Sequence, residues 1–461
     1  MRHRLGSFGR VAIAAAVGCA SLCLVAHESR AANRGEAEAY VQLPMPPHFS
    51  VQLTELDGPV YADASGHTLY KWPFKQMRVG DTGDPLGQSE CTDTKSTATA
   101  GFMSPYPPGL ALPDLDSRPS CAQAWPPAVA AADDKPVGKW SLITRSDGRK
   151  QWAFEGHALY TSVLDHRPGD VLGGDSFRDY GGDNPAVRVP IQPPPDVPAA
   201  FAVTTTRVGR LLETADKHLS VYTSDRDGAD KSNCDEVCAQ TWTPMLAPAS
   251  ARPHGDWSLF ERSPGVLQWA FHKKPLYRYA LDEEARSLRG SDVPGWHNVY
   301  LQLAPAPPAE FTLQNTTTGQ VVADRHGKTI YMYTCGDDAV DQLACDHPTE
   351  PQVYRFSMCG GGDVERCLQT FPYVVADKDA KSTSRLWSIV YIDPHSGRFA
   401  TAGQPGALRV WAYRDRPVYT FAGDEAPGDL HGDSHGEFKG DREGFKAFWL
   451  RDDFFGADSA G

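Results

Sequence analysis

The sequence predicts a mainly β protein with three tandem small antiparallel β domains, sandwich- or barrel-like and stapled by disulfides. A string of aromatic residues occurs three times in constant internal order, which is typical of repeat proteins. The chain has 37 Pro and 42 Gly, a content that disfavours long helices and favours short strands joined by turns. Asp147-Gly148 separates two alternating apolar and polar segments, a pattern that predicts a hairpin.

The aromatic string defines the repeat. Each copy has a Trp-Ser pair in an alternating segment, then a Trp-Ala-aromatic triplet, and its two tryptophans are Trp140 and Trp152, Trp257 and Trp269, or Trp387 and Trp411. Because these six recur beside apolar neighbours, we expect them in cores, whereas the unmatched Trp72, Trp296 and Trp449 are expected to be exposed. Pro-rich stretches at 190–198 and 304–308 separate the copies, giving units of 50–190, 200–304 and 311–453.

Residues 1–31 have the pattern of a secretory signal peptide. Arg2, Arg4 and Arg10 precede an uncharged run that ends before small residues, which predicts cleavage after Ala31. The run is short for a membrane span and no later stretch approaches that length, so no transmembrane segment is expected in the mature chain. The alternative is a lipid anchor at Cys19, within a degenerate lipoprotein box. Either route predicts a periplasmic or secreted protein.

The chain carries a formal net charge of −13, and loss of the Arg-rich leader would make it more negative. An acidic surface repels phosphate backbones, so nucleic acid is excluded as a partner.

Eight cysteines follow the leader, and an even number in an exported chain predicts disulfides. The aligned copies place together Cys91 and Cys121, Cys234 and Cys238, and Cys359 and Cys367, and leave Cys335 and Cys345 as a local bridge in the third copy. The loops between aligned cysteines differ in length. A disulfide tolerates this, whereas a redox or copper-binding pair does not, so staples are favoured although the connectivity stays open.

An Asp- and Gly-rich loop follows the last tyrosine of each string. Oxygen ligands on such a loop suit calcium, and the third copy adds imidazoles that suit a transition metal. The candidate metal ligands are Asp424, Asp429, His431, Asp433 and His435. Asp-Gly pairs also form ordinary turns, which is the favoured interpretation.

Tyr-x4-Asp occurs at Tyr160 and Asp165, Tyr222 and Asp227, Tyr277 and Asp282, and Tyr419 and Asp424. Together with the Cys-Ala-x-x-Trp-x-Pro and Gln-Trp-Ala-aromatic strings, this resembles the bacterial secreted-repeat, or predicted-lipoprotein, family that bears the Y-x4-D motif. The resemblance covers nearly all of the mature chain and implies compartment and fold rather than activity. At the motif spacing Tyr70 is followed by Lys75 and Tyr331 by Gly336, so these two copies are expected to be degenerate if the motif is a site.

The sequence contains no catalytic constellation, which favours a non-enzymatic binding or scaffold protein of the cell envelope. Its expected partner is an envelope protein or a small ligand, neither of which the sequence identifies. One alternative is a metal-binding or redox-associated protein that uses the His- and Asp-bearing loop. Another is a carbohydrate-binding protein that uses exposed aromatic side chains.

Overall fold

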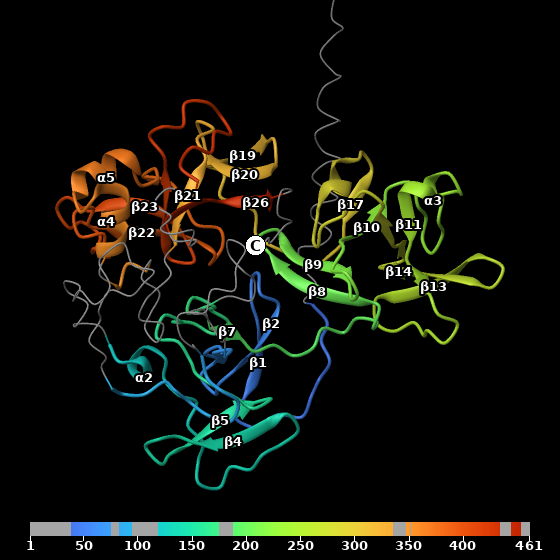
Figure 1. Ribbon diagram of the computed structural model, residues 1–461, viewed down its shortest axis with the longest axis horizontal. Helices are drawn as coiled ribbons and strands as arrows, with labels where there is room; N and C mark the ends of the chain where they lie inside the picture. Colours follow the sequence, from blue (N-terminus) through green and yellow to red (C-terminus); the bar gives the residue numbers. More distant parts are fainter. Residues whose placement is uncertain are drawn as a thin grey trace, which may run out of the picture. The chain divides into compact units, whose positions relative to one another are not determined.

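Short strands joined by tight turns make up the chain, as its Gly and Pro content predicts (Figure 1). The computed structural model describes residues 38–74, 83–94, 119–174, 188–334, 347–350, 352–433 and 444–452. The fold is mainly β, with many small antiparallel sheets, and within these ranges no sheet closes into a barrel. The predicted β class is therefore confirmed, whereas the predicted signal peptide lies outside the described residues.

Residues 50–190, 200–304 and 311–453 are called the first, second and third segments. Within the described residues, the first segment contains three small sheets and one short helix. The sheets pair β1 (Ser50–Leu53) with β2 (Pro59–Ala62), β3 (Tyr70–Lys71) with β7 (Val189–Pro190), and β4 (Trp140–Thr144) with β5 (Lys150–Phe154), which also pairs with β6 (His157–Ala158). Gly148 has a φ of 83° in the β4–β5 turn, a conformation that favours glycine, and the predicted hairpin is confirmed. Helix α2 (Cys121–Ala124) begins with a capping box made by Ser120 and Gln123.

The second segment has the fullest set of strands. One sheet joins β8 (Phe201–Thr206), β9 (Gly209–Thr214) and β18 (Tyr300–Leu303); another joins β10 (Val221–Ser224), β11 (Trp242–Pro244), β16 (Tyr277–Tyr279) and β17 (Trp296–Asn298); the third joins β12 (Leu246–Ala247), β13 (Trp257–Ser263), β14 (Val266–Phe271) and β15 (Lys274–Pro275). The helical turns are α3 (Cys238–Thr241) and the 3-10 helix η2 (Arg289–Asp292).

The third segment adds two longer helices. One sheet joins β19 (Phe311–Thr316), β20 (Gly319–Asp324) and β26 (Trp449–Asp452), and the other joins β21 (Ile330–Thr334), β22 (Trp387–Ile392), β23 (Leu408–Tyr413), β24 (Arg416–Thr420) and β25 (Gly444–Ala447). Helices α4 (Val353–Gly360) and α5 (Val364–Thr370) lie side by side (Figure 1). The Asp363 side chain accepts the Arg366 N–H and so caps α5.

One aromatic hairpin recurs in all three segments. The strand that begins with Trp-Ser pairs with the strand that carries Trp-Ala, and Trp140 lies opposite Phe154, Trp257 opposite Phe271, and Trp387 opposite Tyr413. The six recurrent tryptophans are 1–4% exposed, so the predicted core role is confirmed. Burying each of these large rings stabilises the fold by roughly 2–3 kcal/mol.

Two tryptophans that were expected to be exposed are buried, and that expectation is wrong. Trp72 is 3% exposed, with the Arg188 guanidinium 4.1 Å from its ring centroid. Trp296 is also 3% exposed and stacks on Trp242 at a centroid distance of 3.7 Å. Trp449 is half-buried and packs against the core of the third segment, so none of the three side chains is exposed as expected and carbohydrate binding loses their support.

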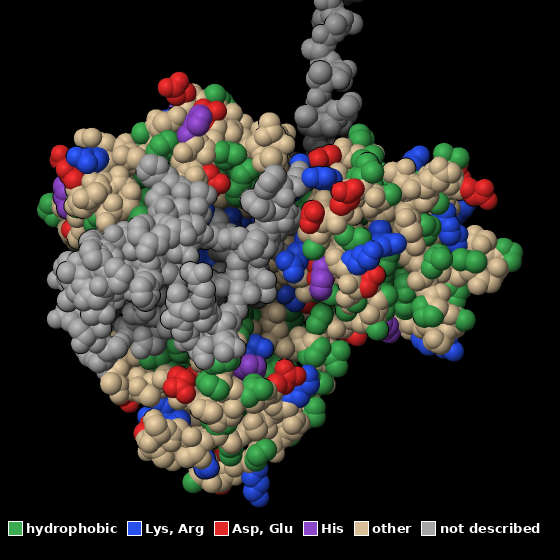
Figure 2. Space-filling model, viewed as in Figure 1, with side chains coloured by type: hydrophobic (Ala, Val, Ile, Leu, Met, Phe, Trp, Pro, Cys, Tyr) green, Lys and Arg blue, Asp and Glu red, His purple; other side chains and the backbone are tan. Residues whose placement is uncertain are grey.

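Among the described residues, none of the helices has the length and apolar character needed to cross a membrane. On the face drawn in Figure 2, acidic and basic side chains are intermingled with hydrophobic ones.

Candidate functional site

The tyrosines of the repeat face one another across antiparallel pairs. Tyr222 on β10 is directly opposite Tyr277 on β16. Tyr70 and Tyr160 form the same pair in the first segment, and Tyr331 and Tyr419 form it in the third. Each segment therefore has two halves whose central tyrosines meet.

In the second segment, the aspartate of each Tyr-x4-Asp motif binds the tyrosine of the other half. The Tyr222 hydroxyl donates to Asp282 at 2.5 Å, and the Tyr277 hydroxyl donates to Asp227 at 2.8 Å. Each tyrosine thus bonds to the aspartate of the other motif and not to the aspartate of its own motif. The two motifs together therefore link the two halves of the segment.

Tyr70 and Tyr331 make the same bond, although the motif spacing after them is broken. Tyr70 donates to Asp165 at 2.8 Å, and Tyr331 donates to Asp424 at 2.7 Å. Both tyrosines keep this bond although their own copies lack the motif aspartate, because the aspartate that each one contacts comes from the other half. Whether the motif is a site, and these two copies degenerate, stays a prediction. Tyr419 packs against Tyr373 with ring centroids 4.9 Å apart.

Asp84 supplies the carboxylate that the motif lacks after Tyr70. Its Oδ2 accepts the Tyr160 hydroxyl at 2.7 Å, and its Oδ1 accepts the Glu90 N–H, as Asp227 accepts the Asn233 N–H. Sequence reasoning missed Asp84 because an insertion moves it away from Tyr70.

A second shared pattern could have located Asp84. The strings Asp84-x4-Ser89-x-Cys91 and Asp227-x4-Ser232-x-Cys234 have identical spacing. In both, the serine hydroxyl lies within hydrogen-bonding distance of the tyrosine hydroxyl, at 2.9 Å for Ser89 and 2.7 Å for Ser232.

An arginine extends this network in the first two segments. Arg145 donates to Ser89, to Gln151 and to the Cys91 carbonyl. Arg262 donates to the corresponding partners Ser232, Gln268 and the Cys234 carbonyl.

In the third segment, apolar residues stand in place of the Arg and Gln of this network. Ile392 aligns with the arginine and Val410 with the glutamine, and both are fully buried. Since a buried guanidinium needs its partners, exchange of both members together keeps the core satisfied.

The tyrosines of this network act as donors. Burial, reinforced by the neighbouring carboxylates, raises the pKa of Tyr70, Tyr160, Tyr222 and Tyr331 well above the usual value, and that of Tyr277 to about 12. Burial also raises the pKa of Asp165 to about 7. The protonated tyrosine hydroxyls therefore donate to the carboxylates, and these hydrogen bonds connect loops from the two halves of a segment.

Six of the eight predicted disulfide cysteines lie in the described residues, and all six are paired. The disulfides are Cys91–Cys121, Cys234–Cys238 and Cys359–Cys367, as the aligned copies suggested. Cys335 and Cys345 lie outside the described residues.

The acidic loop after Tyr419 uses its carboxylates for backbone contacts. Asp424 accepts the His431 N–H, Asp429 accepts the N–H groups of Glu425 and Ala426, and Asp433 accepts the Ala447 N–H. The His431 side chain is 65% exposed, with Nδ1 3.5 Å from Asp424 Oδ1 and 3.8 Å from Asp429 Oδ2. His435 lies outside the described residues. The described part of the chain contains no group of three or more His, Cys, Asp or Glu side chains placed to hold a metal.

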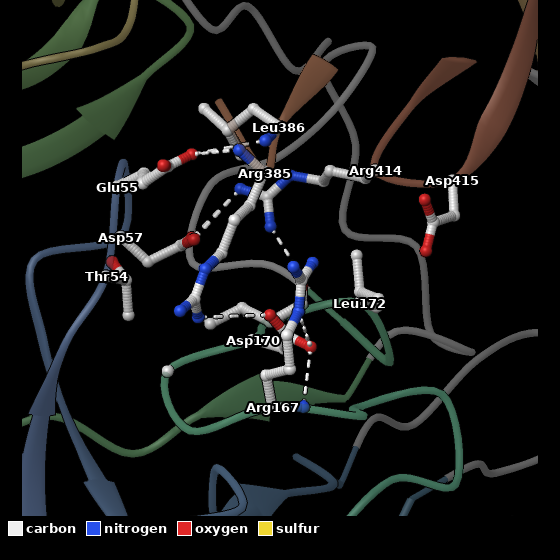
Figure 3. A pocket seen from close by; sticks show the side chains of 12 residues that line it. Thr54, Glu55, Asp57, Arg167, Asp170, Leu172, Arg385, Leu386, Arg414 and Asp415 are labelled. Carbon is white, nitrogen blue, oxygen red and sulfur yellow. Dashed lines mark hydrogen bonds and ion pairs between the residues drawn. The ribbon is translucent and has the colours of Figure 1, made fainter. Parts of the chain in front are cut away.

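A polar pocket lies where the first and third segments meet (Figure 3). The buried Arg414 guanidinium donates to both oxygens of Asp57, at 3.2 and 3.0 Å, and to the Val171 carbonyl at 2.7 Å. Arg385 donates through its backbone N–H to Glu55 and through its side chain to the Pro168 carbonyl. These contacts are between charged or polar groups of the chain itself, which fits a joint between segments.

Arg414 is positioned by a turn that recurs in the chain. Arg414 and Asp415 have φ values of 49° and 61°, and the same positive φ pair occurs at Glu155-Gly156 and at His272-Lys273. Two central residues with positive φ are typical of type I′ hairpin turns, whose twist matches that of the strands. The third segment thus uses a standard hairpin tip to carry the arginine that reaches Asp57.

Comparison with protein-family models finds a match for residues 408–442 with a family described as a secreted repeat of unknown function. This stretch contains β23, β24, Tyr419 and Asp424. The comparison with curated proteins and the comparison with solved structures gave no match.

Proposed function

We propose that the chain is an exported protein of three tandem secreted repeats that acts by binding or scaffolding rather than by catalysis, in the periplasm or outside the cell. One observation carries this proposal: the groups that the repeat motif brings together are buried and bonded to each other. A site for turnover needs reactive groups that a substrate can reach, and these groups are occupied in holding two halves of each segment together.

The three-repeat architecture is supported by the recurrence of the same contacts. The opposed tyrosines, the Tyr to Asp bonds and the aromatic hairpin occur in every segment, although the family match itself covers only the last one. Each segment also has a disulfide, which suits an exported protein.

Contacts between segments support a rigid array. Gln302 of the second segment donates to the Thr54 carbonyl of the first at 2.8 Å, and Arg207 of the second segment donates to the Trp449 carbonyl of the third. Arg414 joins the third segment to the first through Asp57. Because each segment contacts the other two, the surfaces of the three segments would keep fixed relative positions when a partner binds.

Crosslinking tests the binding role directly. The second segment has three large apolar side chains that are more than half exposed: Val237 at 73%, Leu281 at 60% and Leu246 at 54%. A photoreactive amino acid at each of these positions in the full mature chain should give discrete adducts in bacterial envelopes. The same group at the exposed Asp133 is the matched control and should give none. Saturable turnover of a substrate by the purified chain, without adducts at the apolar positions, would contradict the proposal.

A second candidate function, metal binding, would use His431 with Asp424 and Asp429, although among the described residues these side chains do not form a cluster placed to hold a metal. Elemental analysis of the full mature chain should then find a stoichiometric metal that is lost in His431→Ala and kept in the control His297→Ala, whose imidazole faces the single carboxylate of Asp225. Equal metal content in both variants and the parent would exclude His431 as a ligand.

A further inference from the structure

The three described disulfides differ in how accessible they are. Cys91, Cys121, Cys359 and Cys367 are 0–6% exposed. In the Cys234–Cys238 disulfide, Cys234 is 5% exposed but Cys238 is half-buried, and the three residues between them are exposed. Thiol–disulfide exchange requires an incoming thiolate to reach a sulfur, so access favours Cys238.

The Cys234–Cys238 disulfide also closes the shortest loop. Its cysteines are 4 residues apart in sequence, compared with 8 for Cys359–Cys367 and 30 for Cys91–Cys121. The constraint that a disulfide places on the unfolded chain grows with loop length, so this bond contributes least to stability through that route.

Other contacts hold both cysteines in place. On the Cys234 side, Arg262 donates to the Cys234 carbonyl and to Ser232, and Tyr277 donates to Asp227 earlier in the same loop. On the other side, the Cys238 N–H donates to Asp235 Oδ1 at 2.9 Å. Reduction would therefore leave the loop anchored and the two thiols close together, which favours rapid re-formation of the bond.

We propose that Cys234–Cys238 is a reversible thiol–disulfide exchange site that reacts with an external dithiol protein, while the other two described disulfides stay closed. The partner thiolate attacks Sγ of Cys238, the Cys234–Cys238 bond breaks, and Cys234 leaves as a thiolate. The second thiol of the partner then attacks the partner's first sulfur, which is bonded to Cys238 in the mixed disulfide, and Cys238 leaves as a thiolate. The partner loses two electrons and two protons to become a disulfide, and the chain gains both cysteine thiols.

Reduction under native conditions tests the accessibility. The full mature chain is treated with increasing dithiothreitol, quenched with an alkylating reagent and analysed by peptide mass spectrometry. Cys234 and Cys238 should be alkylated at a dithiothreitol concentration at least tenfold lower than the other four, with an unchanged near-UV circular dichroism spectrum. In guanidinium chloride this difference should disappear. Simultaneous alkylation of all three pairs under native conditions, or loss of the spectrum when Cys234 is alkylated, would overturn the proposal.

A trapping experiment tests the direction of attack. Thioredoxin whose second active-site cysteine is replaced by serine forms mixed disulfides that cannot resolve. The expected adduct joins thioredoxin to Cys238 of the full mature chain, and the chain with Cys234→Ser and Cys238→Ser should give no adduct at the remaining cysteines. An adduct on Cys91, Cys121, Cys359 or Cys367, or no adduct with the parent chain, would overturn the assignment.

Discussion

The Tyr70 hydroxyl donates a hydrogen bond to Asp165, a residue 95 positions further along the chain. The same long-range relationship joins Tyr222 to Asp282 and Tyr331 to Asp424. In each case a tyrosine from the first half of a segment is bound by the aspartate that follows the tyrosine of the second half. The motif therefore fastens two halves that could otherwise separate, and its loss should destabilise the fold.

A double-mutant cycle measures this fastening in the second segment. Tyr222→Phe removes the donor to the buried Asp282, and a hydrogen bond to a charged group contributes about 1.5–3 kcal/mol. We expect Tyr222→Phe and Asp282→Asn to show a coupling of at least about 1 kcal/mol in the free energy of unfolding, measured by urea denaturation.

The control cycle pairs Tyr222 with Asp227, its neighbour in the motif but not its hydrogen-bonded partner. The coupling between Tyr222→Phe and Asp227→Asn should be smaller than that between Tyr222→Phe and Asp282→Asn. The reverse order of the two couplings would show that the motif acts locally.

The aromatic cores could be predicted from the sequence because their signal is local. Trp140 and Trp152 recur with fixed spacing beside apolar residues, and a hairpin of two adjacent strands brings them together. The exchange of aspartates could not be predicted in this way. Tyr277 and Asp282 are neighbours in sequence, but strand pairing across the segment decides which tyrosine Asp282 meets.

Long-range partners also explain the two wrongly assigned tryptophans. Trp72 has no counterpart in the other copies, which favoured exposure, but Arg188 covers it from more than a hundred residues away. Trp296 stacks on Trp242 of a different strand. Absence from the repeat pattern showed only that these rings are specific to one segment.

Replacement of Asp165 should change how stability depends on pH. Burial raises the pKa of Asp165 from 3.8 to about 7, so the folded state binds a proton more tightly than the unfolded state. The resulting stability is fully present below pH 3.8, the ordinary pKa, and is lost as the pH rises through 7. Asp165→Asn removes this dependence. The free energy of unfolding of the parent minus that of the variant should therefore fall by up to about 4 kcal/mol between pH 4 and about pH 8, and then stay level.

Urea denaturation at several pH values gives this difference. The exposed Asp133→Asn serves as the control and should keep the pH dependence of the parent. A difference between parent and Asp165→Asn that does not vary with pH would show that Asp165 titrates alike in the folded and unfolded chain.

Removal of individual disulfides should destabilise the chain in order of loop length. Cys91–Cys121 closes a loop with a separation of 30 and should contribute about 3–4 kcal/mol, and Cys359–Cys367, with a separation of 8, about 2–3 kcal/mol. Paired Cys→Ser variants compared by thermal unfolding test this order. A larger loss for Cys359–Cys367 would mean that native contacts, and not loop closure, dominate its effect.

The Arg414–Asp57 pair should account for much of the stability of the contact between the first and third segments. Both side chains are at most 3% exposed, so removal of the arginine would leave the Asp57 carboxylate buried without the guanidinium nitrogen that donates to both of its oxygens. Breaking one partner of a buried pair costs about 3–5 kcal/mol. Arg414→Ala should lower the free energy of unfolding by that amount and increase hydrogen exchange at Leu386 and Leu172, which line the same pocket. Lys139→Ala, which removes an exposed ion pair with Glu155, is the matched control and should leave the urea midpoint within error of the parent. If Arg414→Ala is as stable as this control, the segments are held together by other contacts, and the rigid array proposed above loses its main support.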